Sequence, residues 1–336
     1  MDLATSYMGL QLRNPLVASP SPLSYTLDGV RRLADGGVGA IVLFSLFEEQ
    51  LREEVLRNAD LLDRPAEGFS EALSYVPAIV TDDVGPRSYL SLLRRAVATV
   101  DVPVIASLNG VTPEGWTDYA RAMQDAGAAA IELNVYYVPG DPRISGRDVE
   151  QRHVEVLQRV KAAVTVPVAV KLSPYFSSVG DMAVRLDEAG ADALVLFNRF
   201  LQPDIDPEQL AVRPHVNLTS PADARLPRAW IAILRRSVSA SLAATTGVEV
   251  PADVARYLLA GADVVMTTSA LLRHGPGYAV ELLDGLRTWM SRKGFDTLDD
   301  LRGMLSVPAT ADRAQLARSG YVSAMRAANA GAYAPW

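Results

Sequence analysis

The residues of this chain best suited to chemistry are polar side chains that stand where apolar runs end. Lys171 closes the run Val-Ala-Val-Lys-Leu, and burying its ammonium without a partner would cost on the order of several kcal/mol. The amine must therefore reach an anion or an electron-rich ligand; an ion pair with Glu132 on the neighbouring run is the structural alternative. Asn109, Asn134 and Asn198 end three further runs with amides that can both donate and accept hydrogen bonds.

Two more runs end in hydroxyl side chains just before expected helices. One run closes as Thr245-Thr246-Gly247, and the next closes at 267–269 as Thr-Thr-Ser. Backbone N–H groups and hydroxyls at the start of a helix bind phosphate. Two adjacent strands that share this ending favour a phosphate-bearing ligand, although the threonines could instead be ordinary β-branched strand residues.

The elements that must position these side chains repeat along the chain. The tripeptide Ala-Gly-Ala occurs at 126–128, 189–191 and 260–262 and precedes an apolar run each time. An amphipathic stretch follows most of the apolar runs. Strands that alternate with helices imply βαβ units, and parallel strands buried on both faces are continuous apolar runs. The expected strands are 15–19, 40–45, 103–108, 130–135, 167–172, 193–198, 241–246 and 264–268.

Helices fit between these strands, with Asp28 and Asp181 as candidate N-caps. Eight strands of this kind predict an α/β chain with a (β/α)8 TIM barrel, whose polar strand ends meet at one mouth. A doubly wound open sheet is less favoured, because no Gly-x-Gly-x-x-Gly follows the first strand. The expected helices are 28–36, 87–99, 115–126, 147–164, 179–189, 227–238, 251–260 and 276–292.

The predicted domain plan is one barrel with an extension. Residues 1–295 would form the barrel with an N-terminal hairpin, and 296–336 a C-terminal helical extension and tail. Three segments are longer than a barrel needs: 46–86, 136–146 and 199–226. All three leave strand ends on the side of the mouth, and long ordered loops are uncommon unless they are functional.

Composition limits the function further. Of the 336 residues 49% are hydrophobic, enough for a large core, and the net charge of −7 argues against a nucleic-acid partner. There is no apolar run of about eighteen residues and no basic leader, so we expect a cytoplasmic protein without a membrane partner. The absence of cysteine excludes disulfides, thiolate metal sites and thiol catalysis.

Other polar clusters are weaker candidates. The pair Asp82-Asp83 is typical of a solvated loop, and no metal site is expected. His153, His215 and His274 are scattered along the chain, and none is expected to be a catalyst.

The motifs at the strand ends resemble the FMN-dependent dihydroorotate dehydrogenases, most of all the soluble class 1 branch. Residues 8–19 are similar to the hairpin of that family that leads into the first strand. Residues 132–134 resemble its fourth strand, and 170–176 are very close to its fifth. Residues 246–248 and 268–271 match the phosphate-binding segments at the end of its barrel.

The resemblance implies bound FMN and a small-molecule substrate, with dihydroorotate oxidised to orotate in pyrimidine biosynthesis. Lys171 would face the N1/C2-carbonyl edge of the flavin, where negative charge builds on reduction, while a hydride passes to N5. The remaining implied contacts are Ala18, Ser19, Asn109, Asn134, Asn198, Thr246, Gly247, Thr268 and Ser269 for the cofactor and Asn134, Asn198 and Arg199 for the substrate. A homodimer is implied by the resemblance alone.

The chain departs from that family on the substrate side. The loop after the fourth strand should supply a cysteine or serine base, but here it offers Tyr136 and Tyr137, with Ser145 weaker. A tyrosine base needs a pKa far below about 10, and packing in a lid is the alternative for both rings. Ser45 stands where the family has a lysine, and the usual Asn-rich stretch is replaced around 75–85. A different small cyclic or unsaturated substrate, or a flavin-binding homologue with little catalysis, therefore stays open.

Overall fold

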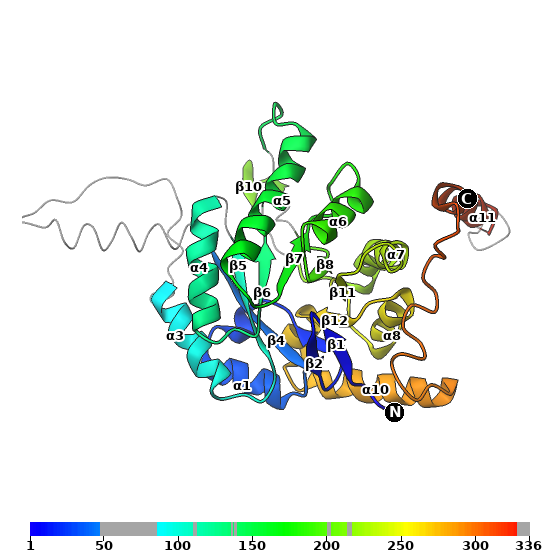
Figure 1. The fold of residues 1–336 in the computed structure, drawn as a ribbon. Helices are drawn as coiled ribbons and strands as arrows, with labels where there is room; N and C mark the ends of the chain where they lie inside the picture. Colours follow the sequence, from blue (N-terminus) through cyan, green and yellow to red (C-terminus); the bar gives the residue numbers. More distant parts are fainter. Residues whose placement is uncertain are drawn as a thin grey trace, which may run out of the picture.

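Eight parallel strands close into a barrel in the order β11-β12-β3-β4-β5-β6-β7-β8, and helices surround it in this computed structural model (Figure 1). The predicted (β/α)8 barrel is confirmed. The structure describes residues 1–47, 86–109, 113–135, 137, 140–199, 203–213 and 217–327. The barrel strands are β3 (Leu16–Ala18), β4 (Ala40–Phe47), β5 (Val104–Asn109), β6 (Ala130–Asn134), β7 (Val168–Leu172), β8 (Ala193–Leu196), β11 (Ser241–Ala244) and β12 (Val264–Thr267).

The outer helices lie close to their predicted places, and the helix expected at 227–238 is present as α7 (Arg225–Leu234). A short helix after β12 and two 3-10 turns were not predicted. The helices are α1 (Leu27–Asp35), α3 (Pro86–Val97), α4 (Pro113–Asp125), α5 (Gly146–Ala163), α6 (Val179–Glu188), α7 (Arg225–Leu234), α8 (Pro251–Ala260), α9 (Ser269–His274), α10 (Tyr278–Lys293) and α11 (Arg313–Ala327), with turns η1 (Pro22–Ser24) and η2 (Pro221–Ala224).

Local chemistry explains where these helices begin and end. The predicted caps Asp28 and Asp181 are wrong: they lie in the first turns of α1 and α6, and the caps are the hydroxyls of Thr26 and Ser178. A hydroxyl at the N-cap satisfies a backbone N–H of the first turn, which an acid one turn later does not. At the other end, the glycine of each Ala-Gly-Ala tripeptide has a φ between 94° and 121°, a conformation that favours glycine.

A hairpin closes the amino-terminal end of the barrel. Strands β1 (Thr5–Tyr7) and β2 (Leu10–Leu12) are joined by Met8 and Gly9, which both have positive φ, as this tight turn requires. We call residues 5–12 the plug, because Tyr7, Met8 and Leu12 are buried among side chains inside the barrel. Alanines at the interior positions that surround the plug leave space for it: Ala40, Ala130, Ala169, Ala193 and Ala243.

Two further segments lie outside the barrel. Strands β9 (Asp204–Asp206) and β10 (Ala211–Arg213) pair as an antiparallel hairpin within 199–226, where the sequence had predicted only a loop. The chain after α10 returns along the barrel, since Gly303 N donates to Leu258 O, and it then leads to α11, which lies apart from the barrel (Figure 1). The predicted domain boundary after residue 295 stays a prediction.

Two kinds of feature are absent from the described ranges. No helix there combines the length and the apolar character needed to cross a bilayer. No cluster of three or more His, Asp or Glu side chains there is placed to hold a metal ion. The pair Asp82-Asp83, most of 46–86 and His215 lie outside the described residues.

Candidate active site

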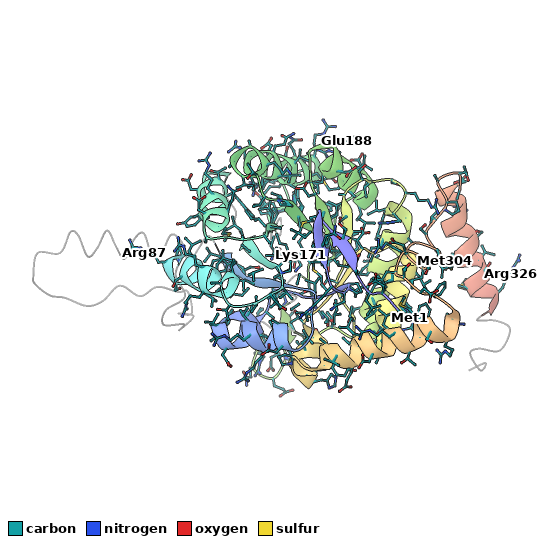
Figure 2. The ribbon with its side chains drawn as sticks, turned by 60° about the horizontal axis from the view of Figure 1, so that its bottom comes forward. Met1, Arg87, Lys171, Glu188, Met304 and Arg326 are labelled. Atoms are coloured by element: carbon teal, nitrogen blue, oxygen red, sulfur yellow. The ribbon has the colours of Figure 1, made fainter. Side chains whose placement is uncertain are left out.

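Inner-facing positions of the barrel become polar toward the carboxyl ends of the strands. Alternate residues of a strand share a face, and Ala130 and Ala169 belong to the cluster inside the barrel. Glu132 and Asn134 on β6, and Lys171 on β7, therefore face inward as well. Figure 2 shows Lys171 among the barrel strands, inside the ring of helices. Because the plug closes the opposite end, a ligand reaches these groups from the carboxyl end.

Lys171 forms an ion pair inside the barrel. Its Nζ lies 3.4 Å from Oε1 of Glu132, and the two side chains are 10% and 1% exposed. The other carboxylate oxygen, Oε2, has no hydrogen-bond partner among the described residues. The ion pair that the sequence offered as the structural alternative is thus present. It keeps the amine inside the barrel, so it leaves the predicted cofactor role of Lys171 open.

The ends of three strands meet beside this ion pair. Asn134 is paired with Lys171 in the β6–β7 register, and Asn198 Nδ2 donates to Asn134 Oδ1 at 2.5 Å. The backbone N–H of Asn198 donates to Leu172 O, which ties the end of β8 to β7. The structure therefore brings together Lys171, Asn134 and Asn198, as their places at strand ends predicted.

Arg199 lies on the rim rather than in this group. Its guanidinium lies 3.9 Å from a carboxylate oxygen of Asp223. Hydrogen bonds from the backbone and hydroxyl of Ser220, together with Arg199, hold the pKa of Asp223 below its usual value. The predicted role of Arg199 in substrate binding stays a prediction.

Two buried polar atoms in the upper barrel lack partners. Ser19 follows β3 and Asn109 ends β5, and neither Ser19 Oγ nor Asn109 Nδ2 has a hydrogen-bond partner among the described residues. A buried polar group left unpaired costs about 1–3 kcal/mol. Atoms of this kind at the open end of a barrel are suited to a bound ligand. The methyl of Ala18 packs outward against the helix layer, so Ala18 can face the mouth with its backbone alone.

The turn after β11 has a left-handed backbone. Thr246 and Gly247 have φ of 84° and 70°, which explains why β11 ends at Ala244 and not at 246 as predicted. The buried phenol of Tyr257 lies 2.6 Å from the carbonyl oxygen of Thr246 and fixes this turn. A Cβ on Gly247 would lie 2.6 Å from the carbonyl oxygen of Ser220, so the position requires glycine.

Thr219 is a site residue that the sequence analysis missed. Gly247 N donates to Thr219 Oγ1 at 3.1 Å, and Thr219 N donates to Ser269 Oγ at 3.0 Å. Arg273 donates to the carbonyl oxygen of Thr219 and ties this segment to α9. The ends of β11 and β12 thus meet at Thr219, which lies in a stretch without periodicity and gave no sequence signal. Thr268 Oγ1 donates to Ser19 O and continues the rim to β3.

The structure gives less information about the candidate bases. Tyr136 lies outside them. Tyr137 is half-buried, and the Arg152 guanidinium lies 4.2 Å from the centre of its ring, a cation–π contact that fits the packing alternative. Ser145 is exposed and caps α5 through Asp148 N. The identity of the base stays a prediction.

The two histidines that the structure describes, His153 and His274, lie away from the strand-end residues of the barrel. His153 is buried in α5, its ring packs edge-on against Phe176, and burial lowers its pKa. His274, at the end of α9, pairs with Glu249 on the outer rim. Neither side chain joins the group around Lys171.

Comparison with known proteins agrees with this geometry. A family model described as "Dihydroorotate dehydrogenase" matches residues 68–290, about two thirds of the chain. The chain belongs to the dihydroorotate dehydrogenase family. The resemblance found in the sequence is confirmed, and members of this family are oxidoreductases that act on CH–CH groups.

Relatives of the dihydroorotate dehydrogenase family match nearly the whole chain. The catalytic subunit of dihydroorotate dehydrogenase B (NAD(+)) from Methanothermobacter thermautotrophicus is 28% identical, with 90% of this chain and 98% of the relative covered. The protein of the same description from Halalkalibacterium halodurans is 27% identical, with 90% and 97% covered. The NAD-dependent dihydropyrimidine dehydrogenase subunit PreA of Escherichia coli K12 is 26% identical, with 92% and 78% covered.

Proposed function

We propose that this protein is an FMN-dependent oxidoreductase that acts on the CH–CH bond of a small cyclic substrate, with dihydroorotate as the first candidate. The observation that carries the proposal is the buried Lys171 amine on the inner face of the barrel, beside Asn134 and Asn198 at the open end. FMN, when bound, supplies hydride acceptance at N5. A cation fixed beforehand stabilises the negative charge that develops, without reorganisation.

The residues present fit this cofactor. Ser19 Oγ and Asn109 Nδ2 are buried without partners, which favours a ligand that can hydrogen-bond to both. The left-handed turn at Gly247, whose N–H donates to Thr219 Oγ1, lies at the ends of β11 and β12, where we place the phosphate. We assign the isoalloxazine ring to Ala18, Ser19, Asn109, Asn134, Lys171 and Asn198, and the phosphate to Thr246, Gly247, Thr268 and Ser269.

The proton has to leave by a separate route. Oxidation of a CH–CH bond removes a hydride from one carbon and a proton from its neighbour, so a base must stand on the substrate side of the ring. The chain has no cysteine, and we assign this role to Tyr136 or Tyr137. Asn134, Asn198 and Arg199 would orient the substrate. Replacing both tyrosines by Phe should slow flavin reduction at least a hundredfold, and an unchanged rate removes them from the mechanism.

A dihydropyrimidine is the second candidate substrate. PreA, described as an NAD-dependent dihydropyrimidine dehydrogenase subunit, covers as much of this chain as the dihydroorotate dehydrogenases do. Ser45, where the resemblance implies a lysine, instead shares a hydrogen bond of 2.8 Å with Ser107. A site with one cation fewer is better suited to an uncharged ring than to a carboxylate such as dihydroorotate.

Two measurements test the proposal. The purified protein should take up FMN and show visible flavin absorbance, and a protein that takes up none contradicts the proposal. Under anaerobic conditions dihydroorotate should bleach that absorbance. If dihydrouracil bleaches it and dihydroorotate does not, the second candidate replaces the first. A Lys171→Met variant should lose most FMN affinity, while the conservative Lys171→Arg should keep part of it.

A further inference from the structure

A carboxylate lies directly beside the amine on which the proposed function depends. Glu132 is buried on the inner face of β6, and its Oε1 lies 3.4 Å from Lys171 Nζ. Its Oε2 has no hydrogen-bond partner among the described residues. A buried ion pair this loosely held adds little stability, because desolvation of both charges offsets their attraction. Stability alone therefore gives little reason for a carboxylate here.

The residue that packs below Glu132 gives its carboxylate no hydrogen bond, so Lys171 remains the partner of that carboxylate. This residue is Tyr7 of the plug, which is fully buried, and its hydroxyl has no partner among the described residues. Burial, and then the charge of Glu132, raise the pKa of this phenol well above its usual value. In the part of the chain that the structure describes, Lys171 is the one cation paired with Glu132.

We propose that Glu132 is a positioning residue for Lys171: it holds the ammonium at the floor of the mouth and offsets part of its charge. The proposal rests on the FMN site proposed above. Its consequence is that an ion pair, rather than a bare cation, meets the negative charge that reduction places on the flavin. Glu132 thereby sets how strongly the site favours reduced over oxidised FMN.

The substitution Glu132→Gln isolates this effect. Glutamine keeps the size of the side chain and an oxygen that accepts a hydrogen bond from the amine, but it removes the negative charge. The site becomes more positive, and reduced FMN is favoured. The matched control is Asp263→Asn, because Asp263 is also buried and also paired, with Arg235 at 2.9 Å, but belongs to the amino-terminal end of the barrel.

The measurement is the reduction potential of bound FMN, from anaerobic titration against a reference dye. We expect E132Q to bind reduced FMN at least tenfold more tightly relative to oxidised FMN, which is an upward shift of at least about 30 mV for a two-electron couple. D263N should keep the wild-type potential although both variants unfold at lower temperature. A purely structural role for Glu132 predicts equal potentials in the two variants and overturns the proposal.

A double-mutant cycle shows whether Glu132 acts through Lys171. In a K171Q background, measured with enough FMN to saturate the weakened site, the E132Q shift should shrink by at least half, and a full-sized shift there overturns the positioning role. If E132Q does not fold, Glu132→Asp, which withdraws the charge by one CH2, should give a smaller upward shift. A wild-type protein without FMN uptake contradicts the proposed function. Flavin-loaded proteins with equal potentials contradict this inference alone.

Discussion

The two ends of the barrel each hold an ion pair with a buried carboxylate, and the two pairs differ in how well they are satisfied. At the amino-terminal end, both carboxylate oxygens of Asp263 accept from Arg235 at 2.9 and 3.0 Å, and Oδ2 also accepts from Leu242 N at 2.8 Å. At the carboxyl end, Lys171 and Glu132 make one contact of 3.4 Å. The barrel therefore carries a well-satisfied pair at one end and an undersatisfied pair at the other.

This difference separates what the barrel uses for stability from what it offers to a ligand. The amino-terminal end is closed by the plug, and the carboxylate of Asp263 there has its hydrogen bonds satisfied within the protein. The carboxyl end keeps unpaired atoms such as Ser19 Oγ and Asn109 Nδ2. Buried polar groups in folded proteins normally have partners, so the two exceptions beside the open end support the ligand site proposed there.

The largest effect is expected at the well-satisfied pair. Asp263→Ala should lower the free energy of unfolding by about 3–5 kcal/mol, because it leaves Arg235 without its anion and Leu242 N–H without its acceptor. Urea denaturation of the cofactor-free protein measures the loss. FMN affinity, in contrast, should stay within about twofold of wild type. A large loss of FMN affinity with little loss of stability would reverse the roles assigned to the two ends.

A pair of glycines gives the next largest contrast. Gly247 and Gly9 have φ of 70° and 79°, but a Cβ would meet Ser220 O at 2.6 Å in the first case and nothing within 4 Å in the second. Gly9→Ala should cost about 1 kcal/mol from backbone conformation alone, and Gly247→Ala at least about 2 kcal/mol more. Gly247→Ala should also weaken FMN binding at least tenfold. Equal losses in stability would show that the turn after β11 can shift to accommodate the added methyl group.

The sequence predicted those features of the two ends that depend on the periodicity of apolar residues and on residue type. The apolar runs gave the eight strands, and Lys171, Asn134 and Asn198 were located because a polar residue at the end of a buried run is conspicuous. Glu132 was recognised as a partner of Lys171, but its unpaired oxygen depends on distances that no sequence pattern contains.

What the sequence did not predict depends on contacts between distant segments. Thr219 lies in a stretch without periodicity, and its role comes from meeting Gly247 and Ser269 in space. The hairpin of β9 and β10 was missed for a related reason, because its strands are short and its apolar residues, Ile205 and Val212, are exposed, so no buried face was there to impose a pattern.

A third test replaces each ion pair by apolar residues of similar size. Lys171→Met with Glu132→Leu removes two poorly satisfied charges and should be neutral or raise the free energy of unfolding by about 1–2 kcal/mol. Arg235→Met with Asp263→Leu should destabilise by about 1–3 kcal/mol, because Leu242 N–H loses its acceptor. Thermal unfolding of both double variants decides this. A similar change in stability in both double variants would mean that the two ion pairs contribute equally to stability.

The smallest effect at neutral pH is expected at Tyr7, which stands between the two ends. Its hydroxyl is buried without a partner among the described residues, so Tyr7→Phe should leave stability unchanged or raise it by about 1 kcal/mol. At high pH the effect grows. Burial and the nearby carboxylates raise the pKa of Tyr7, so the folded protein keeps a proton that the unfolded chain loses near pH 10.

Stability linked to Tyr7 is therefore fully present below about pH 10 and is lost as the pH rises toward the higher pKa of the folded state. Buried Tyr89 and Tyr257 act in the same direction, since burial raises the pKa of each. Tyr7→Phe should remove one of these protons and make the alkaline fall shallower by about 1.4 kcal/mol per pH unit. Tyr321→Phe, at an exposed site, is the control. An unchanged slope in Tyr7→Phe would mean that the plug opens before Tyr7 ionises, and that the amino-terminal end is the less firmly closed of the two.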